Sequence, residues 1–275
     1  MHRSRSCFAG LASALLAASP AFAGGALEAR YAVSFTGLKI GQAALVVQVN
    51  DDSYSASGSG MVTGVLQLVT GGKGAASARG KLIEGKPSPV NYSASSETDR
   101  RSEELRLAGA GGMIWDEKVE PRPEAADRIP VTDEHRAGAI DPMSALLMPV
   151  ADNRDLTGPA ACDRMLPIYD GRQRYDLEFI YLRTETAKDV KGYSGPVAVC
   201  RVQYHPVAGH RPNRKSVKEL IDNKDIFVWL APIAGTRMLA PQRVSFGTKI
   251  GTFIMHATYF SSEVRSSRAQ APATR

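Results

Sequence analysis

The stretch 164–183, RMLPIYDGRQRYDLEFIYLR, decides the fold class, because an alternating pattern stands on both sides of a turn signal. In its second half the apolar residues fall on one face of an extended strand and the charged residues on the other: Tyr175, Leu177, Phe179 and Tyr181 against Arg174, Asp176 and Glu178. Asp170-Gly171 is a favoured two-residue hairpin turn. The stretch therefore predicts a hairpin of strands 164–169 and 172–183.

The same period of two recurs along the chain. It predicts further strands at 31–36, 40–50, 53–61, 73–83, 90–97, 103–107, 113–119, 197–204, 226–230, 243–250 and 252–259. One short helix is expected near 142–148, where Asp141 can cap and Pro142 suits the first helical position. The polar, proline-bearing segment 121–138 is expected to be a connecting loop. This pattern predicts an all-β fold, a curled, spiral or incompletely closed antiparallel barrel-like sheet.

The first residues indicate export. Arg3 and Arg5 precede a short apolar run from Cys7 to Ala18, and Ala21-Phe22-Ala23 forms a small-residue cleavage site. This is the layout of a signal peptide, and the run is too short to span a bilayer. We predict a signal peptide at 1–23 with cleavage after Ala23, a periplasmic location, a single β-rich domain at 24–261 and a disordered tail at 262–275.

The charge balance restricts the partners. The whole chain has 34 Lys and Arg against 28 Asp and Glu, a formal net charge of +6. An excess of this size is compatible with an anionic envelope surface but is no indication of nucleic-acid binding. No long apolar segment follows the signal peptide, so we expect a protein that does not span a membrane.

Two cysteines remain after the predicted cleavage, Cys162 and Cys200. In an oxidising compartment such a pair is typical of a structural disulfide. Cys200 would share a strand face with Val202 and Tyr204, as a buried bridge requires. A metal site would need companion ligands, and a redox pair would normally be spaced C-x-x-C. We therefore predict a bridge between Cys162 and Cys200.

No catalytic residue is assigned. Ser144 lies on the expected helix close to Asp141, but the sequence identifies no base to activate it. Gly71-Gly72-Lys73-Gly74 lacks the spacing and the Ser or Thr of a phosphate loop, so a turn is expected. Asp176 and Glu178 are interpreted as a solvated strand surface rather than an acid/base pair.

Neither a metal site nor a cofactor site is assigned. His205 and His210 are not spaced as a zinc-binding helix requires, and no acidic residue nearby completes a ligand set. His135 and His256 cannot be connected by spacing. The basic stretch 211–218 suits anionic lipid head groups, although a solvated loop is the simpler interpretation.

The order of several short motifs resembles a known family. These motifs are Gly37-Leu38-Lys39-Ile40-Gly41, Pro89-Val90-Asn91-Tyr92, Asp141-Pro142-Met143-Ser144, Tyr169-Asp170-Gly171-Arg172 and Lys249-Ile250-Gly251-Thr252-Phe253. They resemble the exported bacterial family of domain of unknown function 3108, over about residues 28–260. The resemblance implies a periplasmic protein without an established enzymatic activity, related in architecture to curled β-sheet proteins that support envelope integrity or carry lipids. It supplies no catalytic residues.

Three hypotheses follow. The first is a non-enzymatic periplasmic protein of cell-envelope maintenance that binds a lipid or other amphipathic ligand in an apolar groove. The second is a hydrolase of envelope polymers, which would gather Ser144 with a carboxylate and with His205 or His256. The third is a structural or assembly partner of another envelope protein.

Overall fold

The computed structural model describes residues 23–64, 71–122, 127–151 and 155–266. Most of these residues form β-strands. The strands are β1 Ala23–Phe35, β2 Leu38–Val49, β3 Ser53–Val62, β4 Gly72–Ile83, β5 Lys86–Thr98, β6 Arg101–Ala110, β7 Met113–Glu120, β8 Met148–Pro149, β9 Arg164–Tyr169, β10 Arg174–Thr186, β11 Pro196–Ala208, β12 Ile226–Pro232, β13 Met238–Thr248 and β14 Gly251–Ser266. Helical segments are short: α1 Asp133–Arg136, α2 Lys215–Ile221, and two 3₁₀ turns, η2 Ser144–Leu146 and η3 Pro159–Ala161.

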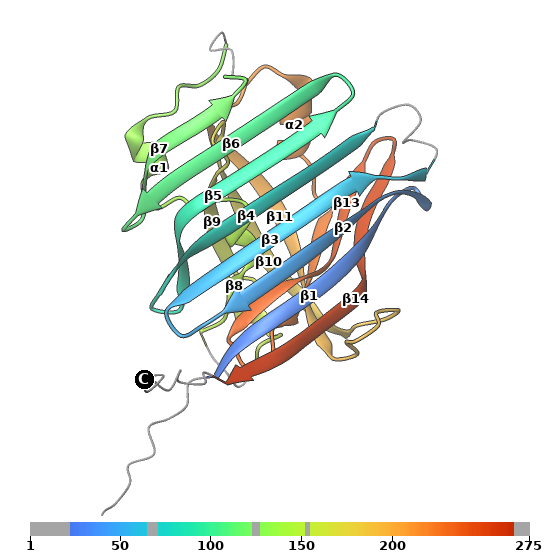
Figure 1. Cartoon of the computed structure of the whole chain (residues 1–275). Helices are drawn as coiled ribbons and strands as arrows, with labels where there is room; N and C mark the ends of the chain where they lie inside the picture. The colour runs from blue at the N-terminus through green and yellow to red at the C-terminus, as the bar shows by residue number, and fades with distance from the viewer. Residues whose placement is uncertain (1–22, 65–70, 123–126, 152–154, 267–275) are drawn as a thin grey trace, which may run out of the picture.

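The described strands make one antiparallel sheet that curls back on itself. Its order is β7-β6-β5-β4-β3-β2-β1-β14-β13-β12-β11-β10-β9, with β8 paired to β13. In Figure 1, β1 to β7 form a broad front layer and β9 to β13 lie behind it. The last strand, β14, lies between β1 and β13 and so joins the two layers. The predicted all-β, incompletely closed fold is confirmed.

The gap between the edge strands β7 and β9 is bridged by a connecting segment. Gly138 donates its N–H to the carbonyl of Gly112 at the β6–β7 turn, with an N–O distance of 2.7 Å. Ile140 donates to Pro167 and accepts from Tyr169, at 2.8 and 2.9 Å. The bridging segment, residues 138–140, thus hydrogen-bonds with β9. In the described residues β7 itself does not pair with β9.

Two apolar clusters form the core. The first joins inward residues of the front layer to Tyr169, Val197, Ala231 and others. The second is built from the back layer and the segment before it: Met148, Val150, Ala161, Cys162, Phe179, Ala198, Cys200, Val202, Val228, Leu230 and Leu239. In β11, Val197 packs in the first cluster and Ala198 in the second, so both faces of this strand are buried.

Several predicted boundaries need correction. Asp170 and Gly171 lie in a longer turn, because β10 begins only at Arg174; Asp170 Oδ1 accepts the N–H groups of Arg172 and Gln173 and so stabilises residues 170–173. The helix expected near 142–148 is the single 3₁₀ turn η2. The expected loop at 121–138 contains α1. Residues 262–266, expected in a tail, continue β14 along β1.

The structure describes little of the predicted signal peptide and of the predicted C-terminal tail. Of the predicted signal peptide only Ala23 is described, as the first residue of β1, and the predicted tail beyond Ser266 is not described. None of the helices in the described ranges has both the length and the apolar character needed to cross a membrane.

Candidate ligand-binding cavity

An apolar cavity lies between the inner face of the front layer and the residues that cover it. Its volume is about 600 Å³, and its exposed walls are almost wholly apolar. One wall is formed by small residues of β3, β4 and β5: Gly58, Gly60, Gly72, Gly74, Ala76 and Ala94. Met143, Leu146, Pro241 and Met255 form the opposite wall.

The cavity exists because side chains are missing from one wall. A Cβ atom built on Gly60 would have its nearest neighbour at 3.6 Å, and one on Gly72 would have its nearest neighbour at 3.4 Å. Both are ordinary contact distances, so the backbone would accept a methyl group there. Protein interiors are normally filled to crystal-like density. The glycines therefore leave volume that the strand geometry itself does not require.

The covering turn is fixed by a buried polar network. Asp141 Oδ1 accepts the N–H groups of Met143 and Ser144, both at 2.9 Å, as predicted for a capping residue. The hydroxyl of Ser144 donates to Asp141 Oδ2 at 2.5 Å, so the hydroxyl of Tyr54 donates to Ser144 Oγ, at 2.6 Å. Burial raises the pKa of the Asp141 carboxyl, although these hydrogen bonds oppose the shift. The network holds Met143 and Leu146 against β3.

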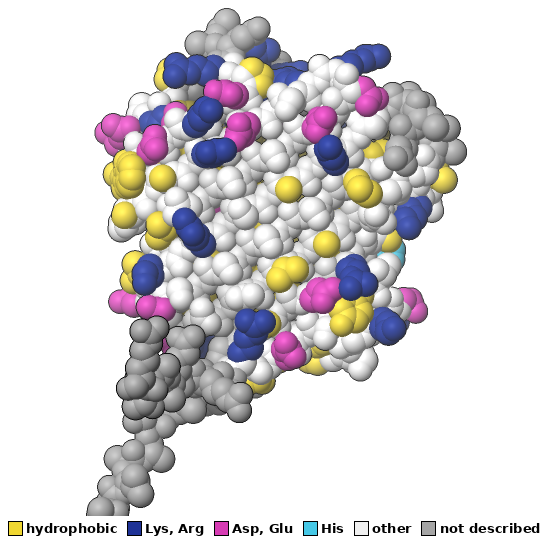
Figure 2. All heavy atoms as spheres, in the orientation of Figure 1, with side chains coloured by type: hydrophobic (Ala, Val, Ile, Leu, Met, Phe, Trp, Pro, Cys, Tyr) yellow, Lys and Arg dark blue, Asp and Glu magenta, His cyan; other side chains and the backbone are white. Residues whose placement is uncertain are grey.

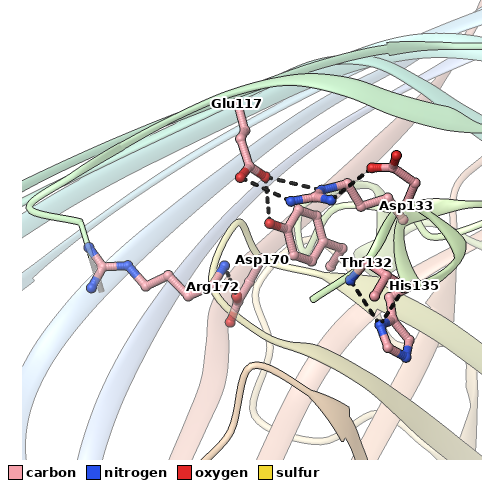
Figure 3. A network of polar contacts seen from close by, with 8 residues as sticks. Glu117, Thr132, Asp133, His135, Asp170 and Arg172 are labelled. Carbon is pink, nitrogen blue, oxygen red and sulfur yellow. Dashed lines mark hydrogen bonds and ion pairs between the residues drawn. The ribbon is translucent and has the colours of Figure 1, made fainter. Parts of the chain in front are cut away.

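A second polar network closes the seam between β7 and β9 (Figure 3). Glu117 of β7 accepts the hydroxyl of Tyr169, the last residue of β9, at 2.5 Å. Its carboxylate also pairs with Arg136 of α1 at 3.1 Å, and Arg136 pairs with Asp133 at the same distance. On the other side of the turn after β9, Arg172 forms an ion pair with Glu103 of β6 at 3.3 Å. The two edges of the sheet are therefore joined by side chains.

The outer face of the front layer has a different character. Figure 2 shows a surface whose centre is mostly small and polar, with few charged side chains. A hollow of about 760 Å³ lies on it, with Arg30, Gln42, Ser59 and Lys73 among its lining residues. We place the candidate site in the inner cavity instead, because its exposed walls are almost wholly apolar.

The residues of a hydrolase site are not brought together. Ser144 is fully buried and hydrogen-bonds with Asp141 and Tyr54. His205 Nε2 lies 2.9 Å from Glu178 Oε2 on the exposed part of β10 and β11. His256 lies in β14, at the register of Arg243. In the ranges that the structure describes, no cluster of three His, Cys, Asp or Glu side chains is arranged to hold a metal ion.

Other candidate residues take structural positions. Asp176 is not simply solvated, since it pairs with the largely buried Arg174 at 2.7 Å. The turn expected at Gly71-Gly72-Lys73-Gly74 gives way from Gly72 onward to the start of β4, in line with the strand predicted at 73–83, and Gly72 and Gly74 line the cavity. Much of the basic stretch 211–218 lies at the start of α2 rather than in a loop.

Cys162 and Cys200 are joined by a disulfide, with their Cα atoms 5.7 Å apart. Both cysteines are fully buried in the second apolar cluster. The bridge ties the end of the segment 148–162 to the middle of β11.

Comparison with known proteins gives a family but no activity. The family described as "Protein of unknown function (DUF3108)" matches residues 30–258. A crystal structure titled as a beta-barrel-like protein of domain of unknown function DUF1849 from Brucella abortus is similar at 9% identity and a TM-score of 0.46. The similarity covers 86% of this chain and 98% of that one. No curated protein matches the chain.

Proposed function

Since this chain belongs to the DUF3108 family of proteins of unknown function, we propose a function from its own geometry. We infer that it is an exported, non-enzymatic protein of the cell envelope that binds the apolar chain of a lipid or similar amphipathic molecule. The ligand's chain would lie in the inner cavity. The observation that carries this proposal is the apolar cavity of about 600 Å³.

The size and lining of the cavity favour a small apolar ligand. Binding sites for small molecules typically have volumes of about 300–1,000 Å³ and mostly apolar walls. The cavity is within this range, and its opposite walls are formed by Gly and Ala on one side and by Met and Leu on the other. Methionine side chains adapt to ligands of varying shape. An acyl chain needs no hydrogen-bond partner, which suits these walls.

The position of the charged residues favours an amphipathic rather than a wholly apolar ligand. Lys73 and Glu97, which flank the cavity on β4 and β5, form an ion pair at 2.9 Å, and both side chains are more than half exposed. A polar head group attached to a buried chain would remain near such solvated groups. The buried disulfide supports export, because such bridges persist in oxidising compartments.

A pair of adjacent substitutions tests the proposal. Ala76 faces the cavity, while its neighbour Ser77 is exposed on the outer face and does not line the cavity. Ala76→Phe should fill the cavity and weaken binding of a fluorescent fatty-acid probe at least about tenfold. Ser77→Phe should leave the affinity unchanged, and both variants should keep the wild-type circular dichroism spectrum.

The endogenous ligand is sought in the same protein. Organic extraction of wild-type protein purified from the envelope fraction, followed by mass spectrometry, should release a lipid that the Ala76→Phe variant lacks. Equal probe binding by both variants, or no binding by the wild type, would refute the proposal. Recovery of a protein partner without any lipid would favour an assembly role instead.

A further inference from the structure

Three segments that are distant in sequence meet at one end of the sheet. Thr36, in the β1–β2 turn, donates its N–H to the carbonyl of Thr252 in β14, at 2.9 Å. Lys249, in the β13–β14 turn, pairs with Glu219 of α2 at 3.0 Å. Figure 1 shows the two hairpin turns at the same end, to the right. We call residues 36–39, 249–253 and 215–224 together the tip surface.

The tip surface exposes large apolar side chains at its turns. Ile250 is 83% exposed, Leu38 is 57% exposed and Phe253 is 40% exposed. Ile221, at the end of α2, is 44% exposed. Phe253 also packs against Phe35, with ring centroids 4.5 Å apart, so the two hairpins support one another. Exposed apolar residues gathered in this way indicate an interaction site.

Cations surround these apolar side chains. Lys39, Lys215, Lys218, Lys224 and Lys249 are all exposed on the tip surface. The acidic residues on the same segments are Glu219, which pairs with Lys249 and Lys215, and Asp222. Just beyond them, Asp225 accepts the N–H of Gly247 through its backbone carbonyl. The surface therefore carries an excess of positive charge around an apolar centre.

We propose that the tip surface docks on an anionic lipid bilayer. Ile250 and Leu38 would enter the head-group region, and the lysines would lie among the lipid phosphates. Each lysine close to an anionic membrane strengthens binding by about fivefold. Neither contribution is strong alone, since stable association with a bilayer usually combines an apolar and an electrostatic signal.

The location of the cavity agrees with this orientation. Three of its lining residues stand at strand ends on the same end of the sheet as the β1–β2 turn: Val62 ends β3, Gly72 begins β4 and Thr98 ends β5. Docking through the tip surface would bring this end of the cavity towards the bilayer. The docking itself does not depend on the cavity being occupied, so the two proposals are tested separately.

Vesicle flotation tests the docking. We expect purified protein to float with vesicles of phosphatidylglycerol and phosphatidylcholine in equal parts, and not with phosphatidylcholine alone. Raising the salt to about 0.5 M should release the protein, because exposed charges are then screened. Equal flotation with both vesicle types, or none with the anionic vesicles at low salt, would overturn the proposal.

Matched variants locate the contact. Leu38→Asp with Ile250→Asp should reduce vesicle binding at least about tenfold, and Lys39→Glu with Lys218→Glu by a similar factor. The control comes from the β4–β5 turn at the opposite end, where Ile83 is 54% exposed beside the exposed Lys86. Ile83→Asp with Lys86→Glu should bind like the wild type.

Two outcomes would contradict the assignment. One is an equal loss in the control variant, which would point to overall charge rather than the tip surface. The other is a wild type that ignores vesicles but dimerises in solution, with dimers lost in the Leu38→Asp and Ile250→Asp variant. The tip surface would then bind a second copy of the chain. Probe binding in solution should stay unchanged in all tip variants, which separates this failure from failure of the cavity proposal.

Discussion

The two layers of the sheet are built by the same antiparallel pairing but differ in how completely side chains fill their inner faces. At one end of β3 and β4 the inward residues Gly58, Gly60, Gly72 and Gly74 line a void, whereas Tyr54, Ala56 and Ala78 further along the same strands pack in the first apolar cluster. The back layer instead packs Phe179, Val202, Val228, Leu230 and Leu239 into a buried cluster with a disulfide. Both layers therefore share the antiparallel pairing and both contribute to the core, while side-chain volume decides where along the front layer a cavity remains.

Removing the disulfide should have the largest effect, because it belongs to the packed layer. The bridge closes a sequence separation of 38 residues. For a loop of this size the chain-entropy estimate is about 4 kcal/mol. Cys162→Ala with Cys200→Ala should lower the free energy of unfolding in urea by about that amount. Reductant should weaken the wild type and leave the variant unchanged; a loss below about 1 kcal/mol would contradict this assignment.

One substitution in each layer compares directly how tightly the two layers are packed. Leu230 is 1% exposed in the packed cluster, so Leu230→Ala should cost about 3 kcal/mol through lost burial and a new void. Ala76→Leu, which adds a similar number of atoms to the cavity wall, should change stability by less than about 1 kcal/mol. Urea unfolding of both variants measures the difference. A large loss in the Ala76→Leu variant would show that the cavity wall is as tightly packed as the other layer.

The polar contacts between β7 and β9 should contribute less to the free energy of unfolding than the buried core. Tyr169→Phe removes the hydroxyl that donates to Glu117 but leaves Arg136 beside that carboxylate. We expect a loss of about 1 kcal/mol and faster amide exchange in β7. Tyr193→Phe removes a hydroxyl that donates to the nearby carbonyl of Pro196, and serves as the control. If both variants behave alike, the seam has no special role.

The smallest expected effect is a change in pH dependence at the buried turn. Burial raises the pKa of the Asp141 carboxyl above that of an unfolded chain. The folded state then binds the proton more tightly, so the contribution is complete below about pH 4 and is lost as the pH rises through the raised pKa. Relative to Asp141→Asn, the wild type should therefore gain stability as the pH falls from about 7 to 4. Urea titrations at several pH values test this sign.

The alternation of apolar and polar residues predicted the strands well, because it reflects the burial of one face of each strand. The bounds predicted for 164–169 agree with β9, and β3, β4 and β7 differ from their predictions by one residue at an end. The sheet order could not be predicted, since period two does not reveal which strands pair. α2 was missed because a helix of two turns carries few apolar positions, here Val217, Leu220 and Ile221.

The cavity was harder to foresee than the fold. Glycine is usually interpreted as a turn former, so the run Gly71–Gly74 was assigned to a turn, although it overlaps the strand predicted at 73–83 and both Gly72 and Gly74 line a wall. The signal that could have found them is their spacing of two, shared with Gly58 and Gly60. The capping role of Asp141 was predicted from local sequence. Its link to Tyr54 through Ser144 was not, because it joins residues 90 positions apart.

The position of β14 has a consequence for how the chain reaches its final form. β14 is the final strand that the structure describes, and it pairs with β1 on one side and with β13 on the other. A polypeptide is synthesised from its N-terminus. A chain halted before residue 251 would carry two unpaired edges, at β1 and β13, that invite association with other chains. The sheet is therefore complete only after β14 has been synthesised.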